Sequence, residues 1–149
     1  MLIRVINRSD KPSWLAMRTA LWPEMKQDHE IELDQFFANE SIDIEEVFII
    51  EIDDEVIGFI ELNIRDFAEG SRNSRVPYVE AWYIKPDFQN KGYGTKLMLQ
   101  AEQWALSKGF DELASDTEID NAHSIALHQN LGFSETYRIV CFLKSLKNS

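Results

Sequence analysis

The sequence predicts a single α/β domain built on a mixed β-sheet. Its 149 residues suit one domain with a sizeable core. Runs of β-branched and aromatic residues alternate with segments of helical periodicity, and no repeat or low-complexity linker interrupts them. The expected order over residues 1–149 is β-α-α-β-β-β-α-β-α, followed by one or two final strands.

The first half of the chain is expected to supply two helices and a hairpin. Ser9 and Asp10 offer cap oxygens for a helix that ends before Pro23, because the residue before proline avoids helical geometry. Asp53 and Asp54 predict a tight hairpin turn, and Gly58 predicts a bulge or a close backbone approach. The expected elements are a strand at 2–7, a helix at 28–40 and strands at 47–52 and 56–64.

The second half is expected to alternate strands and helices. Residues 66–77 contain Gly70, two serines and an asparagine, which predicts a mobile surface loop and a candidate substrate lid. The expected elements after it are strands at 79–84 and 112–115, helices at 94–106 and from Asp120 or Asn121 to 130, and final strands from 133 through 143.

Composition excludes several classes of function. A net charge of −11 argues against a nucleic-acid partner, because binding phosphates needs Lys and Arg. No apolar run is long enough to span a membrane, and the N-terminus lacks a signal-peptide pattern, so a cytoplasmic location is expected. The single cysteine, Cys141, excludes an internal disulfide. Residues 24–55 hold thirteen acidic residues against Lys26 alone, either as a solvated face or as a surface that attracts cations.

Residues 79–99 run from an apolar strand through a loop with two glycines into a helix. This arrangement suits a phosphate group, because the first N–H groups of a helix lack partners and small residues allow close approach. The P-loop pattern and the dinucleotide fingerprint are both absent.

The loop Gln89-Asn90-Lys91-Gly92-Tyr93-Gly94 resembles the Q/R-x-x-G-x-G/A loop of the GCN5-related N-acetyltransferases, which use acetyl-CoA. Asn121 and the later Leu131-Gly132-Phe133 resemble the second signature of the family. The resemblance implies a mixed, mostly antiparallel sheet flanked by helices. It also implies coenzyme contacts from Trp82, Tyr83, Ile84, Gln89, Asn90, Lys91, Gly92, Tyr93, Gly94, Thr95 and Asn121, with charge added by Lys96.

Two carboxylates are candidates for handling the acceptor amine. Acetyl transfer needs a neutral amine, so a nearby carboxylate can hold the cation and accept its proton. Glu80 lies in the strand that leads to the coenzyme loop, and Asp116 follows the next strand, where ligands gather in α/β sheets. Either of them can be the base; plain structural roles remain open for both.

Further segments resemble the short, single-domain aminoglycoside 6′-N-acetyltransferases. These are Leu21-Trp22-Pro23, residues 64–67, Val79-Glu80-Ala81 and residues 114–117. The resemblance implies an acceptor site lined by Trp22, Met25, Phe67, Glu80, Asp116 and Tyr137. Phe67, Tyr137 and Met25 differ from the residues usual in that group, where tyrosine, glutamate and histidine occur.

His128 occupies the position at which many members of the family carry a tyrosine that reprotonates the leaving thiolate. A histidine can exchange a proton near neutral pH, and the alternative is a histidine that only packs or lies on the helix surface. His123 and His128 do not share a helix face, and no cysteine or carboxylate completes a metal set, so no metal is expected.

The expected function is therefore acetyl-CoA-dependent acetylation of a small polycationic amine, in particular the 6′-amine of an aminoglycoside, by direct attack in a ternary complex. One alternative is the same chemistry on a polyamine or a peptide N-terminus. A second is a non-catalytic acyl-CoA-binding module. Homodimers are frequent in the resembled group, and apolar strands at the C-terminus suggest pairing between two chains.

Overall fold

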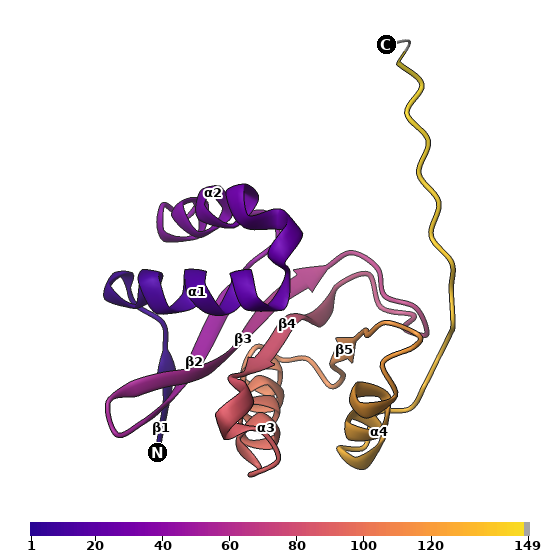
Figure 1. Cartoon of the computed structure of the whole chain (residues 1–149). Helices are drawn as coiled ribbons and strands as arrows, with labels where there is room; N and C mark the ends of the chain where they lie inside the picture. Colours follow the sequence, from indigo (N-terminus) through magenta and orange to yellow (C-terminus); the bar gives the residue numbers. More distant parts are fainter. Residues whose placement is uncertain (148–149) are drawn as a thin grey trace.

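The computed structural model describes residues 1–147 and contains a mixed five-stranded sheet with helices on both faces (Figure 1). The strands lie in chain order, and all neighbours are antiparallel except β4 and β5, which are parallel. Their bounds are β1 Leu2–Val5, β2 Glu46–Ile52, β3 Glu55–Arg65, β4 Val76–Ile84 and β5 Ala114–Ser115. This arrangement confirms the predicted mixed, mostly antiparallel sheet.

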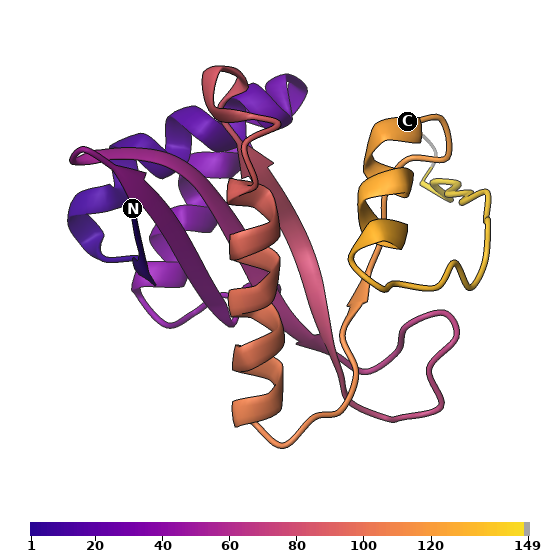
Figure 2. The same ribbon diagram turned by 90° about the horizontal axis from the view of Figure 1, so that it is seen from below.

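The helices form one layer on each side of the sheet (Figures 1 and 2). The α1 and α2 helices cover one face, α3 crosses the other, and α4 lies beside β5. Their bounds are α1 Lys11–Leu21, α2 Lys26–Phe37, α3 Tyr93–Ser107 and α4 Ala122–Asn130, with short 3₁₀ turns at Arg8–Asp10, Pro23–Met25 and Pro86–Phe88. None of the helices within residues 1–147 combines the length and the apolar character that a membrane crossing requires.

Each face of the sheet has its own core, because successive side chains of a strand point to opposite faces. Ile49 and Phe59 pack with Trp14, Met17 and other residues of α1 and α2. On the other face, the neighbouring strand residues pack beneath α3; this second core includes Ile50, Ile60, Leu62, Leu97, Met98 and Ala101. The continuous apolar runs of β2 and β3 therefore reflect strands that are buried on both sides.

The predicted β2–β3 hairpin is confirmed, and its turn has the expected chemistry. Asp53 and Asp54 both adopt positive φ angles, of 48° and 64°, which a two-residue hairpin turn requires. Gly58 provides the predicted close approach: a Cβ at this position would lie 2.6 Å from the carbonyl oxygen of Tyr83. The pairing of β2 with β3 also shifts register beside Gly58.

Two expectations about strands were wrong. The segment expected to be a loop through residue 77 ends earlier, because β4 begins at Val76 and Pro77 pairs with Ile64. Proline is tolerated there because it stands at the start of the strand. The final strands expected within residues 133–143 do not form in this chain. That segment extends away from the body, with Val140, Phe142 and Leu143 exposed, so it has no neighbouring strand to bond (Figure 1).

A buried carboxylate joins the first strand to the first helix. Asp10 accepts hydrogen bonds from both terminal nitrogens of Arg4, at 2.8 and 2.9 Å, and from the backbone N–H of Asn7 at 2.8 Å. The bond from Arg4 holds the pKa of Asp10 below its usual value, against the opposing effect of burial. The ionised carboxylate is therefore the form that stabilises the fold.

We expect Asp10→Asn to lower the free energy of unfolding by about 1–3 kcal/mol at neutral pH, because the amide loses the charged pair with Arg4. The folded pKa of Asp10 is depressed, so its stabilisation is present above the unfolded pKa of about 3.9 and is lost as pH falls through the folded value. Urea unfolding at pH 7 and between pH 5 and 3 measures this. The difference should shrink in acid, whereas the exposed Asp87→Asn should show little effect at any pH.

Candidate active site

Glu80 stands at an irregularity in the middle of the sheet. Glu61 pairs with Ala81 and Leu62 pairs with Val79, so Glu80 is an extra residue opposite the β3 strand. A bulge of this kind redirects the side chain that it carries. It explains how an acidic residue is accommodated within a strand whose neighbours Val79 and Ala81 are buried.

The two parallel strands separate directly after this point. The β5 strand pairs with β4 only at Tyr78 and Val79. Within residues 1–147, the edge of β4 from Glu80 to Ile84 therefore has no strand beside it on the β5 side. Backbone donors and acceptors on such an edge are free for an extended ligand.

The glycine-containing loop opens α3 beside this edge. Gly92 is the N-terminal cap residue of α3 with φ of 86°, and Asn90 also has a positive φ of 62°. These left-handed residues turn the chain so that the first N–H groups of α3 face outward. A helix terminus with unpaired N–H groups attracts anions, and the exposed Lys91 and Lys96 add positive charge.

Two side chains fix the loop to β4. Trp82 donates from Nε1 to the carbonyl oxygen of Gly94 at 3.0 Å, and Gln89 donates from Nε2 to the carbonyl oxygen of Ile84 at 2.8 Å. The strand edge and the helix terminus are thus held in one rigid unit. This unit contains residues 82–84 and 89–95, which the sequence predicts to contact the coenzyme.

A pocket of about 320 Å³ lies on the other face, beneath α1 and α2. It brings together Trp22 and Glu80, two of the predicted acceptor residues. Its complete lining is Arg18, Trp22, Glu32, Asp43, Ile44, Glu61, Arg65 and Glu80. With two arginines and four acidic residues, the lining has a net negative charge that suits a cationic ligand.

A buried ion pair forms part of this pocket. Arg18 donates from Nε to Glu61 at 2.6 Å and from Nη2 at 3.1 Å, and Trp14 donates to the same carboxylate at 2.9 Å. Arg18 also reaches Glu32 and the ring of His29, whose other nitrogen donates to the carbonyl oxygen of Trp22 at 2.9 Å. Burial raises the pKa of the Glu61 carboxyl, and the Arg18 guanidinium opposes that effect. The network fixes the end of α1 that carries Trp22.

The two predicted carboxylates have different partners. Glu80 accepts two hydrogen bonds from Arg65, at 2.6 and 2.7 Å, and one from Asn63 at 3.1 Å. Asp116 accepts one hydrogen bond from the hydroxyl of Tyr78, at 2.7 Å. Burial raises the pKa of that hydroxyl, and the bond to Asp116 raises it further. Tyr78 thus remains a neutral donor that orients Asp116.

His128, on α4, contacts a residue of each of the two parted strands, Ser115 of β5 and Trp82 of β4. Its Nδ1 donates to the carbonyl oxygen of Ser124 at 2.8 Å, which leaves Nε2 of the neutral ring to accept from the hydroxyl of Ser115 at 2.8 Å. Its ring also meets those of Trp82 and Phe133 edge to face, with centroids 5.4 and 5.2 Å apart. The ring is therefore held both by hydrogen bonds and by packing. Asn121 caps α4 through Ser124, as one of its two interpretations predicted.

The pocket that holds Trp22 and Glu80 is not lined by the other predicted acceptor residues, which are Met25, Phe67, Asp116 and Tyr137. Met25 and Phe67 are exposed at the surface, and Tyr137 is exposed on the extended C-terminal segment. The loop before β4, a candidate lid, is attached by hydrogen bonds: Ser71 and Asn73 both donate to Glu112, and Thr136 donates to the carbonyl oxygen of Glu69.

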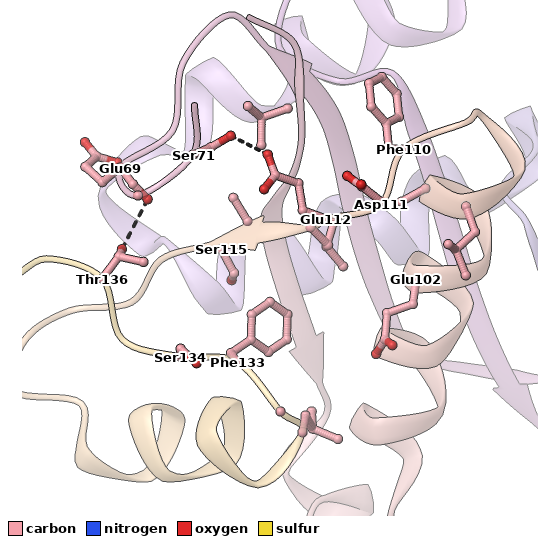
Figure 3. A pocket seen from close by; sticks show the side chains of 18 residues that line it. Glu69, Ser71, Glu102, Phe110, Asp111, Glu112, Ser115, Phe133, Ser134 and Thr136 are labelled. Carbon is pink, nitrogen blue, oxygen red and sulfur yellow. Dashed lines mark hydrogen bonds between the residues drawn. The ribbon is translucent and has the colours of Figure 1, made fainter. Parts of the chain in front are cut away.

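None of the predicted site residues lines a second, larger pocket of about 550 Å³ (Figure 3). The second half of α3, the β5 strand, the loop at residues 69–71 and the segment 131–136 surround it. Figure 3 shows Phe133 beside β5 and the bonds that join Thr136 to Glu69 and Ser71 to Glu112. This pocket lies between the second half of α3 and β5, and Ser115 and Phe133 of its lining also contact His128.

Sequence reasoning did not assign functions to Arg18, Glu61, Arg65 or Tyr78. These residues could not be assigned from the sequence, because a single charged or aromatic residue in a helix or strand is not part of a motif with fixed spacing. Glu61 was the most visible of them, as an acidic residue inside an apolar strand. Within residues 1–147, His, Cys, Asp and Glu side chains form no group of three that could hold a metal ion.

The parted strands, the glycine loop at a helix terminus and the acidic pocket together suit a phosphorylated ligand beside a cationic one. The model of the acetyltransferase (GNAT) family matches residues 13–133. This chain belongs to that family.

Its relatives include an aminoglycoside N(6′)-acetyltransferase type 1 from Klebsiella aerogenes, which is 37% identical over 147 residues, with 97% of each chain covered. The apo crystal structure of the aminoglycoside antibiotic 6′-N-acetyltransferase AAC(6′)-IG from Acinetobacter haemolyticus matches with a TM-score of 0.88 and 32% identity, over 99% of this chain and 100% of that one. The structure of AAC(6′)-Iy with the bisubstrate analogue CoA-S-monomethyl-acetylneamine matches with a TM-score of 0.88 and 32% identity, over 97% of both chains.

We expect Arg18→Met to lower the free energy of unfolding by about 3–5 kcal/mol, because the carboxylate of Glu61 would stay buried without its counter-charge. Urea unfolding of the wild type and the variant measures the loss. The double variant R18M/E61Q should recover at least half of it, since no buried charge remains. Arg138→Met, which breaks an exposed pair with Glu135, serves as the control. A loss no larger than that of the control would contradict the prediction.

Proposed function

We propose that this protein is an acetyl-CoA-dependent N-acetyltransferase that acts on the 6′-amine of aminoglycosides. The full-length similarity to aminoglycoside N(6′)-acetyltransferases carries the proposal, together with the acidic pocket that joins Trp22 and Glu80. Residues 1–149 act as one catalytic domain in this proposal. A cytoplasmic location follows from the proposed use of acetyl-CoA, which is made inside the cell.

The coenzyme half of the site is the loop and the free strand edge. The N–H groups at the start of α3, together with Lys91 and Lys96, bind the pyrophosphate in this proposal. The backbone of Trp82, Tyr83 and Ile84 bonds the extended arm and donates to the thioester carbonyl. Acetyl-CoA supplies the activated acetyl group. His128, held by Ser115 and Ser124, is the group of this chain placed to return a proton to the leaving sulfur, which it does in the form that carries a proton on both ring nitrogens.

The acceptor half is the pocket that holds Glu80. Asp116 lies outside its lining and is linked to it through Tyr78, which donates to Asp116 and carries Arg65 over its ring. A carboxylate there lowers the cost of presenting a neutral amine, because it binds the ammonium form and takes its proton directly or through a water. The acidic tract at residues 24–55 contributes Glu32 and Asp43 to the pocket, which supports its role in attracting a cation. In this proposal the amine attacks the thioester directly in a ternary complex, without an acylated side chain.

Two other functions are distinguishable. Acetylation of a polyamine or a peptide N-terminus uses the same coenzyme half, and the exposed Phe67 and Tyr137 keep it open because they depart from the pattern of the aminoglycoside enzymes. A non-catalytic acyl-CoA-binding module needs the coenzyme half alone. The two oriented carboxylates favour an enzyme over such a module.

Steady-state kinetics across amine acceptors test the proposal. We expect kanamycin and tobramycin, which carry a free 6′-amine, to release free thiol from acetyl-CoA with a kcat/KM at least about 100-fold above that of aminoglycosides lacking this amine. The control omits the acceptor. A polyamine or peptide that reacts faster than every aminoglycoside contradicts the proposed substrate. Calorimetric binding of acetyl-CoA without thiol release from any acceptor would indicate the binding module.

We also propose that the protein forms a homodimer through its C-terminal segment. Val140, Phe142, Leu143 and Leu146 are each at least 75% exposed, which is costly for apolar side chains in water. Within residues 1–147, β5 has no neighbour on its outer edge, and the larger pocket opens beside it. A second copy whose residues 137–146 lie along β5 would bury these side chains and pair the open edge.

We expect the wild type to have the mass of two chains in light scattering coupled to size exclusion. The double variant F142D/L143D should raise the dimer dissociation constant by at least about 100-fold, because each aspartate places a charge in an apolar interface. Ile42→Asp, at an exposed apolar position between α2 and β2, is the matched control and should leave the dimer intact. A monomeric wild type at tens of micromolar would refute the dimer.

A further inference from the structure

Arg65 occupies the acceptor pocket as a cation that belongs to the protein itself. It lies at the end of β3 and lines the same pocket as Trp22 and Glu80. Its Nε and Nη2 atoms donate to the two carboxylate oxygens of Glu80 at 2.7 and 2.6 Å. This two-bond geometry is the strong form of an arginine–carboxylate pair. Asn63 donates a third bond to Glu80, at 3.1 Å.

A second contact keeps the guanidinium in this position. The Cζ atom of Arg65 lies 3.6 Å from the centre of the Tyr78 ring, which is almost fully buried. A guanidinium stacked on an aromatic face gains cation–π attraction. The pair with Glu80 raises the pKa of Arg65, so the guanidinium remains charged. Arg65 is thus fixed on one side by a charge and on another by a rigid ring.

The two carboxylates differ in what they can offer an ammonium group. Both oxygens of Glu80 already accept bonds from Arg65. Asp116 accepts a hydrogen bond from Tyr78 at one oxygen, Oδ2. Its other oxygen, Oδ1, has no hydrogen-bond partner within residues 1–147. Tyr78 is also the ring beneath Arg65, so one buried residue holds the guanidinium over Glu80 and orients Asp116.

We propose that Arg65 is a positioning residue that keeps Glu80 charge-paired and leaves Asp116 as the carboxylate that receives the acceptor amine. The ammonium of a substrate that approached Glu80 would have to displace a two-bond ion pair and would meet the like charge of Arg65. At Asp116 the hydrogen-bond partner is the neutral hydroxyl of Tyr78, so an ammonium group would not have to displace an ion pair there. This inference rests on the proposed cationic acceptor, and it assigns different roles to two carboxylates that the sequence could not distinguish.

The pairing predicts opposite effects for substitutions of its two members. Glu80→Gln frees a positive charge in the pocket, so a polycationic acceptor should bind about tenfold more weakly. Arg65→Gln frees a negative charge, so the acceptor should bind severalfold more tightly. Its kcat should fall by at least about tenfold, because the ammonium is then held at Glu80 in its charged form. A merely structural role for Arg65 would weaken binding instead.

A double-mutant cycle measured by calorimetry tests this directly. Tobramycin is titrated into the wild type, E80Q, R65Q and R65Q/E80Q, without coenzyme. We expect the double variant to regain affinity within about threefold of the wild type, because neither charge remains. Asp116→Asn should weaken binding in both the wild-type and R65Q backgrounds. Arg72→Gln, which removes an exposed charge from the neighbouring loop, controls for net charge, and thermal unfolding checks that each variant is folded.

Three outcomes overturn the inference. In the first, R65Q/E80Q binds as weakly as E80Q, which would mean that Glu80 contacts the acceptor itself. In the second, Asp116→Asn leaves the affinity unchanged. In the third, R65Q weakens binding. A wild type that binds no aminoglycoside refutes the proposed acceptor and the inference with it, whereas wild-type binding with an unrescued double variant refutes the inference alone.

Discussion

The pairing of β4 is the constraint on which the site depends. This strand bonds to β3 along its whole length but to β5 at only two positions, Tyr78 and Val79. Where β5 leaves, the backbone edge of β4 becomes available, and the bulge at the same level turns Glu80 out of the strand pattern. A longer β5 would close that edge, and a regular β3–β4 ladder would bury the carboxylate. Both halves of the site therefore arise at one place in the sheet.

Local charge in the pocket differs from what the net charge of −11 suggests. Arg18 pairs with Glu61 and Arg65 pairs with Glu80, so two arginines neutralise acidic residues of neighbouring strands. The first pair is buried and mainly holds α1 against the sheet. The second is partly exposed and lies in the pocket, where a ligand can compete with it. An arginine–carboxylate pair thus has a structural role at Arg18 and Glu61, whereas the pair of Arg65 and Glu80 affects the binding of the acceptor.

The sequence allowed most of the fold to be predicted, because its strong signals are local. Caps, glycines and the two aspartates of the hairpin located the elements within a few residues. The errors came from segments whose state depends on a neighbour. Pro77 lies in a strand because Ile64 is opposite it, and residues 133–143 are not strands because nothing in this chain lies beside them. Periodicity shows that a segment can form a strand but does not identify its partner.

The sequence by itself determined the family, the glycine loop at the start of α3 and the two carboxylates, since each depends on residue types at fixed spacing. Only the tertiary structure decided how those carboxylates differ. Arg65 is fifteen residues from Glu80, and Tyr78 is 38 residues from Asp116. No spacing rule links such pairs. They meet because β3, β4 and β5 lie side by side, and the energy of a charge depends on the groups that surround it in space.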